Sequence, residues 1–343
     1  MKGFGSDNHA GVHAEIMGAI FKVNQGHQPS YGTDEVSLQC EKVFQKHFGP
    51  QTRIYFVYNG TSCNVLALSA LMKSYEAVLC SDVSHIQVDE CAAPEFFTGG
   101  KLRVLPSYDG KLRLDDLKNT IIRRGDQHYA QDAVISLTQP TELGTLYSYQ
   151  ELQEICRWAK AQGLKIHIDG ARFIHAATQL QKTFKELTTD LGVDILSFGG
   201  TKNGLMMGEV LVVLNPAFNE GLKFLRKQFG ELPSKTRFIS TQFVALMSEP
   251  RNLYQDISNQ SCQMAQLMAA ELTKLGIQPE YPVQANAVFV RFKKEWIKPL
   301  RDQYFFYIWD EKTFVVRLMI SFDTTTEDIE GFIAAVKRLR EMD

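Results

Sequence analysis

The sequence predicts an α/β fold with a mainly parallel central sheet flanked by helices, followed by a smaller α+β domain. Short apolar runs alternate with helical stretches, several runs end at glycine, proline or polar residues, and the pattern changes after about Met247. The 343 residues are enough for two domains. We expect a large domain over 1–247, with an N-terminal arm over 1–15, and a small domain over 248–343.

The elements of the large domain follow from the apolar runs. Strands are predicted over 53–58, 76–81, 132–138, 164–169, 194–198 and 209–214, and helices over 65–75 and 149–163. Asn59-Gly60 breaks the first strand, Pro140 follows the third, and Gly163 is a natural stop for the second helix.

The small domain has a different pattern. A long helix over 252–276 precedes apolar strands over 287–292, 305–309 and 314–322, and a helix over 327–342 ends the chain. This order of elements predicts an α+β arrangement.

The composition favours small molecules as partners and a cytoplasmic protein. A net charge of −2 gives no basic surface for nucleic acid or anionic membranes. The first residues lack the apolar core of a signal peptide, and no run of about 18 apolar residues predicts a spanning helix. The six cysteines form no C-x-x-C pair, which indicates reduced thiols. No His or Cys pair has metal-ligand spacing, so no metal is predicted.

Polar residues follow four of the predicted strands directly. They are Gly60-Thr61-Ser62, His85, Asp169 with Arg172, and Lys202. Ligands of open α/β sheets bind beyond the carboxyl ends of the strands, so we expect these side chains to line one site.

Each of these residues also has a plain structural interpretation. Lys202, after two glycines, is either a desolvated nucleophilic amine or a surface lysine in a turn. Asp169 either keeps a ring nitrogen protonated or pairs locally with Arg172. Gly60, Thr61 and Ser62 either bind a phosphate at a helix start or supply an ordinary N-cap.

Two histidines are candidates for proton transfer. His85 follows a strand and would either stack on a cofactor ring or serve as hydrogen-bonded structure. His128 precedes a strand, and its spacing alone indicates a surface loop.

Taken together, these segments resemble the threonine aldolases and related β-eliminating lyases, a branch of the fold-type-I pyridoxal-phosphate (PLP) enzymes. The resemblance runs from about Gly5 to the C-terminus through GSDNHAG, QPSYGTDE, NGTSCNVLAL, SHIQVDE, HIDGARF, SFGGTKNG and VVRLMISF. HIDGARF and SFGGTKNG are its specific part, and SFGGTKNG is similar to a subgroup that includes phenylserine aldolases.

The resemblance implies PLP as the cofactor and assigns its contacts. Lys202 would hold it as a Schiff base, Asp169 would pair with the pyridine nitrogen, and His85 would stack on the ring. Gly60, Thr61 and Ser62 would bind the phosphate.

The resemblance also implies contacts to the substrate. Arg172 would lie beside the phenolic oxygen of the cofactor and help to hold the substrate. Ser6 and Arg317 would bind the amino-acid carboxylate, Arg317 by a bidentate contact. His128 would act as the base for the β-hydroxyl group.

Three further residues match positions that reach a neighbouring subunit in the family. Tyr31 would enter the site of that subunit, and Lys235 and Arg237 would offer positive charge toward its phosphate. The family is usually tetrameric, built from dimers that share active sites, so the resemblance implies a homotetramer.

The implied reaction is retro-aldol cleavage of L-threonine, L-allo-threonine or a related β-hydroxy-α-amino acid to glycine and an aldehyde. Many threonine aldolases carry E-N-T-H-x-G after the strand that ends here in SLTQPTELG, so Thr141-Glu142 keeps only part of that pattern and lacks the histidine. β-Elimination and transamination on the same scaffold remain open, as does a non-catalytic binding protein.

Overall fold

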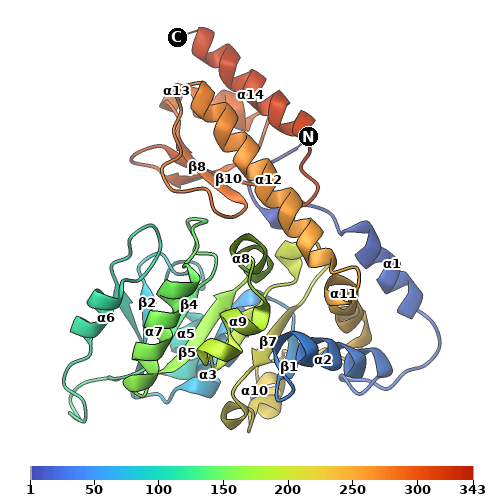
Figure 1. The fold of residues 1–343 in the computed structure, drawn as a ribbon, viewed down its shortest axis with the longest axis vertical. Coiled ribbons are helices and arrows are strands. Elements are labelled where there is room, and N and C mark those ends of the chain that lie inside the picture. Colours follow the sequence, from blue (N-terminus) through green and yellow to red (C-terminus); the bar gives the residue numbers. More distant parts are fainter. Residues whose placement is uncertain (1, 343) are drawn as a thin grey trace.

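The chain forms two sheets, and the larger one carries the residues singled out above. The computed structural model describes residues 2–342 (Figure 1). The strands of the larger sheet are β1 (Arg53–Val57), β2 (Glu76–Ser81), β3 (Lys101–Leu105), β4 (Gln131–Thr138), β5 (Lys165–Gly170), β6 (Ile195–Phe198) and β7 (Glu209–Val213).

The larger sheet has the order β1-β7-β6-β5-β4-β2-β3. The pairs between β2 and β3, β2 and β4, β4 and β5, and β5 and β6 are parallel, whereas β7 is antiparallel to both β6 and β1. Only β7 therefore runs in the opposite direction. The predicted α/β fold with a mainly parallel sheet is confirmed.

Helices cover both faces of this sheet. The helices up to residue 247 are α1 (Ala14–Val23), α2 (Glu35–Phe48), α3 (Gly60–Leu71), α4 (His85–Val88), α5 (Ala93–Thr98), α6 (Leu114–Thr120), α7 (Tyr149–Ala161), α8 (Phe173–Leu180), α9 (Phe184–Leu187), α10 (Leu222–Gln228) and α11 (Arg237–Met247). One core packs α2, α7, α8 and α11 against one face, and a second packs α3 and α10 against the other. Alternate residues of β7 enter opposite cores, Val210 and Val212 facing one and Leu211 and Val213 the other.

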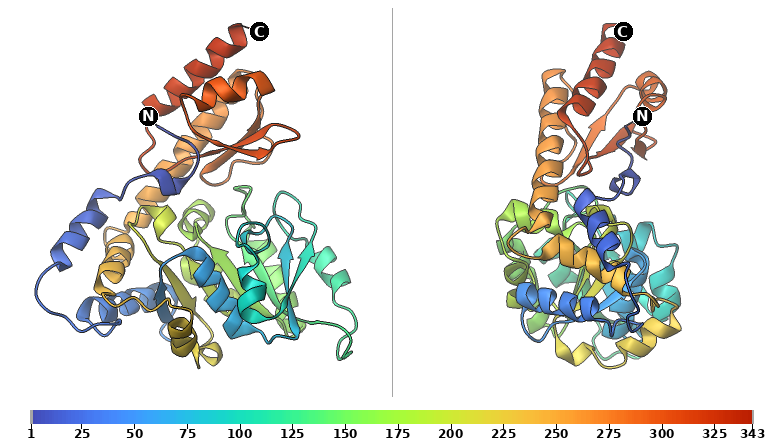
Figure 2. Two further views of the ribbon diagram at one scale, coloured as in Figure 1. Left: turned by 180° about the vertical axis from the view of Figure 1, so that it is seen from behind. Right: turned by 90° about the vertical axis from the view of Figure 1, so that its right-hand side faces the viewer.

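The rest of the chain forms a smaller unit above the larger sheet (Figure 2). Its elements are α12 (Leu253–Lys274), β8 (Ala287–Arg291), α13 (Lys294–Arg301), β9 (Tyr307–Asp310), β10 (Val315–Met319) and α14 (Thr326–Glu341). The three strands form an antiparallel sheet in the order β8-β10-β9.

The helix α12 connects the two units. Its first half contributes Leu253 and Ile257 to the core of the larger sheet, and its second half contributes Met268 and Leu272 to the core of the smaller unit. Phe4 is also buried in the smaller unit's core. The domain division after Met247 stays a prediction.

The predicted elements recur with small shifts at their ends. The helix predicted over 65–75 begins at Gly60, because the Asn59 side chain accepts a hydrogen bond from the Ser62 amide and caps it. The strand β3 was not predicted, because charged and exposed positions interrupt its apolar pattern at the sheet edge. Within residues 2–342, no helix is long and apolar enough to cross a membrane.

Candidate active site

A cavity of about 330 Å³ lies at the carboxyl ends of β4, β5 and β6. Its walls include the strand-end residues Thr138, Asp169 and Phe198. Six of the predicted residues also line it: Gly60, Thr61, His85, Asp169, Arg172 and Lys202. The structure thus brings these six residues to one place, whereas Ser62 does not line the cavity.

Lys202 enters the cavity from the short 3-10 turn that follows β6, η3 (Thr201–Asn203). The two preceding glycines are required by close backbone contacts. A Cβ on Gly199 would lie 1.9 Å from the Ala171 carbonyl oxygen, and one on Gly200 would lie 2.3 Å from the Gly208 carbonyl oxygen. Burial, and then the charge of Arg172, lower the pKa of the Lys202 amine, which favours its nucleophilic neutral form.

Asp169 belongs to a chain of hydrogen bonds that ends at His85. Asn64 on α3 donates through Nδ2 to Asp169 Oδ2 and to Glu90 Oε1, both at 2.8 Å. Glu90 Oε1 also lies 2.8 Å from His85 Nδ1. This bond, more than any other contact, raises the pKa of His85, whereas burial raises the pKa of Glu90. The alternative in which Asp169 pairs with Arg172 is wrong.

The beginning of α3 faces the same cavity. The first intrahelical bond runs from the Cys63 amide to the Asn59 carbonyl group, and the Ser62 amide binds the Asn59 side chain. The amides of Gly60 and Thr61 therefore precede the bonded part of the helix and are available to an anion. Ser62 does not line the cavity, and the alternative in which Thr61 or Ser62 caps the helix is wrong because Asn59 does so.

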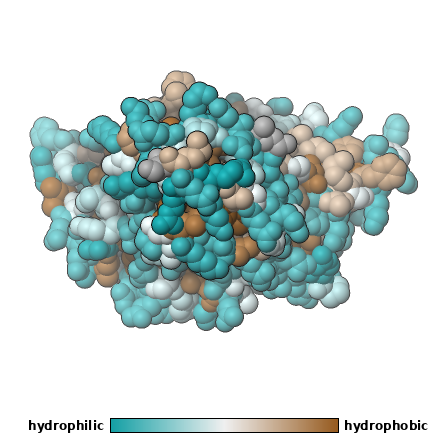
Figure 3. Space-filling view, turned by 90° about the horizontal axis from the view of Figure 1, so that it is seen from above, coloured by the Kyte–Doolittle hydropathy of each residue, from teal (hydrophilic) through white to brown (hydrophobic). Residues whose placement is uncertain are grey.

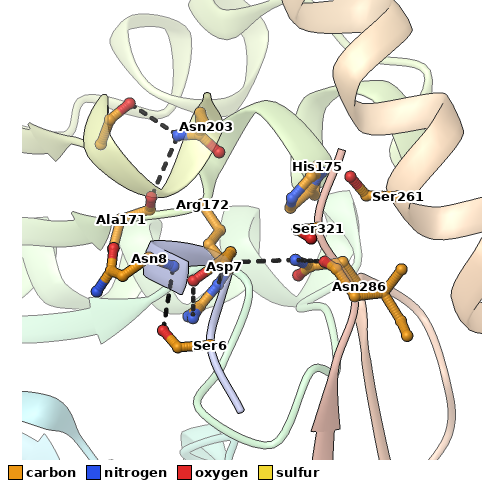
Figure 4. Close-up of polar contacts among 12 residues, drawn as sticks. Ser6, Asp7, Asn8, Ala171, Arg172, His175, Asn203, Ser261, Asn286 and Ser321 are labelled. Atoms are coloured by element: carbon orange, nitrogen blue, oxygen red, sulfur yellow. Dashed lines mark hydrogen bonds and ion pairs between the residues drawn. The ribbon is translucent and has the colours of Figure 1, made fainter. Parts of the chain in front are cut away.

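Arg172 forms an ion pair with Asp7, a residue that sequence reasoning missed. Arg172 Nε lies 2.5 Å from Asp7 Oδ2, and Nη2 lies 3.0 Å from Oδ1. Asn286, which precedes β8, donates to Asp7 Oδ2 at 3.3 Å. Figure 4 shows Asp7 between Arg172 and Asn286, with Ser6 and Asn8 on either side along the chain. Asp7 therefore links the cavity wall to the smaller unit.

Ser6 and Arg317 lie outside the residues that line the cavity. The Ser6 hydroxyl accepts the Asn8 amide at 3.2 Å and caps η1 (Asp7–His9). Arg317, on β10, donates to the Gly5 carbonyl oxygen at 3.2 Å. Burial, and then the charge of Arg172, lower the pKa of Arg317 to about 10. Arg317 and Arg172 both contact the N-terminal segment, at Gly5 and Asp7 respectively.

His128 does not reach the cavity of its own chain. It is exposed in the loop before β4, whereas the cavity lies at the other end of that strand, where Thr138 stands. Eight strand residues separate the two ends by roughly 23 Å. His128 is therefore not among the residues that meet at the cavity of its own chain, and its role as the base for the β-hydroxyl group stays a prediction.

Tyr31, Lys235 and Arg237 lie together on another surface. The Tyr31 amide donates to the Ser234 carbonyl group at 2.9 Å, and Tyr31 is 51% exposed. Lys235 is exposed, and Arg237 donates to the Gly26 carbonyl group at 3.4 Å. None of the three lines the cavity of this chain.

Two buried carboxyl groups of the cavity wall were not predicted as site residues. Burial raises the pKa of Glu142 and of Glu209 to about 7 each. Glu209 Oε2 accepts the Gly200 amide at 2.5 Å and so supports the turn that carries Lys202. Glu209 begins a predicted strand, and this position at a strand start hid its role.

A large mixed sheet with a lysine and an aspartate at neighbouring strand ends defines the class of fold-type-I PLP enzymes. The sequence profile of the β-eliminating lyase family matches residues 3–295. Two low specificity L-threonine aldolases, from Pseudomonas sp. (strain NCIMB 10558) and Pseudomonas aeruginosa, are 37% identical to the chain. The first match covers 97% of this chain and 96% of the relative, and the second covers 95% and 94%. The structure of the Leishmania major threonine aldolase matches with a TM-score of 0.93 at 29% identity, over 99% of each chain.

The chain therefore belongs to the β-eliminating lyase family, in company with the threonine aldolases, and is a PLP-dependent lyase by that membership. The cavity fits this cofactor. Its volume suits one small aromatic ligand. The free amides of Gly60 and Thr61 suit the phosphate, Asp169 suits the ring nitrogen, and the amine of Lys202 suits the aldehyde carbon.

Proposed function

We propose that this protein cleaves the Cα–Cβ bond of L-threonine, L-allo-threonine or a related β-hydroxy-α-amino acid such as phenylserine, giving glycine and an aldehyde. The observation that carries the proposal is the meeting of Lys202 and Asp169 at one cavity. The similarity to L-threonine aldolases over nearly the whole chain supports the choice of reaction.

The chain's own residues prepare this reaction. Gly60 and Thr61 would bind the phosphate through their amides, and Asp169, which Asn64 holds in place, would keep the ring nitrogen protonated. His85 would pack against the ring, and the amine of Lys202 would hold the aldehyde carbon of the cofactor. PLP, once bound, supplies an electron sink for the bond that breaks.

The substrate carboxylate is proposed to bind at the N-terminal segment, where Ser6 and Arg317 lie. Arg317 forms no ion pair within residues 2–342, and its Nε is buried without a hydrogen-bond partner. A half-buried guanidinium group without an anion is costly, and a carboxylate would satisfy it. Arg172 is already paired with Asp7, so its proposed role is to position this segment as well as to border the cofactor.

We also propose a homotetramer, built as a dimer of dimers whose subunits share active sites. The helix α1 projects from the body of the molecule and exposes Met17 and Phe21, the latter 77% (Figures 1 and 2). Figure 3 shows apolar side chains gathered at that end of the molecule. Tyr58 and Met207 are apolar, exposed and part of the cavity wall. A neighbouring subunit would cover them and could supply Tyr31, Lys235 and Arg237. Light scattering of the purified protein tests the assembly.

A cytoplasmic location belongs to the same proposal. All six cysteines are free, and five of them are buried. Unpaired thiols in a chain of this size suit a reducing compartment.

The reaction is tested with purified, PLP-loaded protein and three substrates: L-threonine, L-allo-threonine and phenylserine. We expect glycine and the matching aldehyde in equal amounts. Ammonia with a keto acid would instead indicate β-elimination, and a keto acid with an aminated cofactor would indicate transamination. A protein that takes up no PLP would be a binding protein on the enzyme fold.

A further inference from the structure

Glu142 occupies the turn that follows β4. Its side chain lines the cavity. Glu142 Oε1 accepts the His85 amide at 2.8 Å and the Thr138 hydroxyl at 2.9 Å. Two donors from two different strand ends therefore hold one oxygen of the carboxyl group in a fixed place.

The other oxygen is left without such support. Glu142 Oε2 is buried and has no hydrogen-bond partner in another residue. A buried acceptor without a partner is unfavourable, so a ligand hydroxyl that reached it would be bound favourably. Glu142 lines the cavity, so this carboxyl group combines one anchored oxygen with one buried, unpaired oxygen that a donor from the substrate would satisfy.

The surroundings of Glu142 bring its pKa close to neutral pH. Burial is the main cause that raises its pKa to about 7, and the charge of Asp169 adds to it. The other titratable groups that interact with it electrostatically are Cys80 on β2, Tyr147 before α7 and Arg172 before α8, and its oxygen binds the amide of His85. A general base works best when its pKa lies near the working pH.

We propose that Glu142 receives the proton of the substrate β-hydroxyl group during cleavage. This inference depends on the proposed function. The O–H bond breaks and its proton moves to Glu142, the oxygen becomes the aldehyde carbonyl, and the electron pair of the Cα–Cβ bond stays with Cα. Cα then takes up a proton that ultimately comes from water, and Glu142 releases its own proton to water, so the step balances without a further reactant.

The position of His128 at the opposite edge of the sheet leaves this role open within the chain. His85 is the rival base at the cavity, because the bond of its Nδ1 to Glu90 raises the pKa of the ring and leaves Nε2 able to take up a proton. A second rival is a purely structural Glu142 that only anchors the His85 amide. The variant Glu142→Gln separates these possibilities, because its amide oxygen can still accept both hydrogen bonds but cannot take up a proton.

The main experiment measures cleavage by the PLP-loaded protein from pH 5.5 to 9. In the wild type we expect kcat/KM to fall below an apparent pKa of about 7. Glu142→Gln should lower kcat by about 10²–10⁴-fold, remove this acidic limb and leave KM within about threefold. Asp194→Asn is the matched control, since Asp194 is a buried carboxyl group before β6, away from the cavity, and its loss should leave the pH profile unchanged.

Two further readouts separate a proton acceptor from a structural residue. Exchange of the glycine α-hydrogen in D₂O requires no β-hydroxyl group, so Glu142→Gln should keep this exchange within about threefold of the wild type. Infrared difference spectra of the cofactor-free protein should show a carboxylic acid band that titrates near neutral pH and weakens in Glu142→Gln, with Glu209 supplying the remainder.

The outcomes are distinct. If the wild type yields no glycine from any substrate, the proposed function fails. If the wild type cleaves and Glu142→Gln retains both its rate and its acidic limb, the inference alone is overturned. Equal loss of cleavage and glycine exchange would also overturn it, because it would indicate a structural role.

Discussion

Asp7 and Arg172 form a two-point ion pair between the N-terminal segment and the start of α8, with Nε–Oδ2 and Nη2–Oδ1 distances of 2.5 and 3.0 Å. The Asp7 side chain is 1% exposed and that of Arg172 is 17% exposed. Asn286 donates to the same carboxylate (Figure 4). One buried carboxylate therefore joins the cavity wall, the N-terminal segment and the smaller unit.

The first prediction concerns the removal of this carboxylate charge. Asp7→Asn should lower the free energy of unfolding by about 3 kcal/mol, because a buried guanidinium group loses its counter-charge. Urea unfolding measures the change. The control is Glu249→Gln, which breaks the exposed pair between Lys46 and Glu249 and should cost about 1 kcal/mol or less. Equal costs for the two variants would contradict the importance of the buried pair.

The second prediction concerns the attachment of the cofactor. Lys202→Ala should remove the long-wavelength absorbance of bound PLP and nearly all turnover, because no other lysine within residues 2–342 lines the cavity. Absorbance spectra and the glycine assay measure both effects. Lys298→Ala, at a side chain that is 84% exposed, should change neither. A Lys202→Ala protein with normal absorbance and turnover would refute the proposed site.

The third prediction concerns the amide that joins two carboxyl groups. Asn64 donates to both Asp169 and Glu90, so Asn64→Ala should leave the ring-nitrogen partner less firmly held. Hydrogen bonds to charged groups contribute about 1.5–3 kcal/mol, which corresponds to PLP binding weakened by about 10–100-fold. Equilibrium titration with PLP measures the Kd. Asn215→Ala removes a similar bond to Asp194 at the opposite edge and should leave this Kd unchanged.

Much of the fold could be predicted because buried parallel strands are apolar runs with sharp ends. The runs that form β4, β5 and β6 end at Thr138, at Gly170 and just before Gly199, and these ends meet at the cavity as the strand directions require. The edge strand β3 was missed because the charged residues Lys101 and Arg103 interrupt its apolar run. Strand polarity likewise explains His128, which stands before β4 and so lies at the wrong edge.

The contacts within the site could not be predicted from local pattern. Asp7 and Arg172 are 165 residues apart, and Asn64 and Asp169 are 105 apart, so only the folded chain brings them together. The true helix cap, Asn59, was also missed, because Thr61 and Ser62 are equally common capping residues. Local sequence identified the groups at the strand ends but not the partners that hold them.

The last prediction concerns the pH dependence of stability. Burial is the main cause that raises the pKa of Glu209 from 4.5 to about 7, against the opposing effects of the Gly200 amide, the Thr201 hydroxyl and the Lys202 charge. Between these two values the folded protein binds more protons than the unfolded chain. Stability should therefore be highest at the acidic side of this window and fall as the pH rises through about 7.

Glu209→Gln isolates this contribution, because the glutamine side chain can still accept the Gly200 amide but does not ionise. A shift from 4.5 to about 7 corresponds to roughly 3 kcal/mol. Urea unfolding of the cofactor-free protein at pH 5 and pH 8 measures how much stability is lost between these two pH values. This loss should be smaller in Glu209→Gln than in the wild type by roughly that amount. Glu142 should account for part of the remaining loss, since its pKa is raised in the same direction. An unchanged difference between the two pH values would show that Glu209 is ionised at little cost, and that the turn carrying Lys202 rests on a charged rather than a protonated carboxyl group.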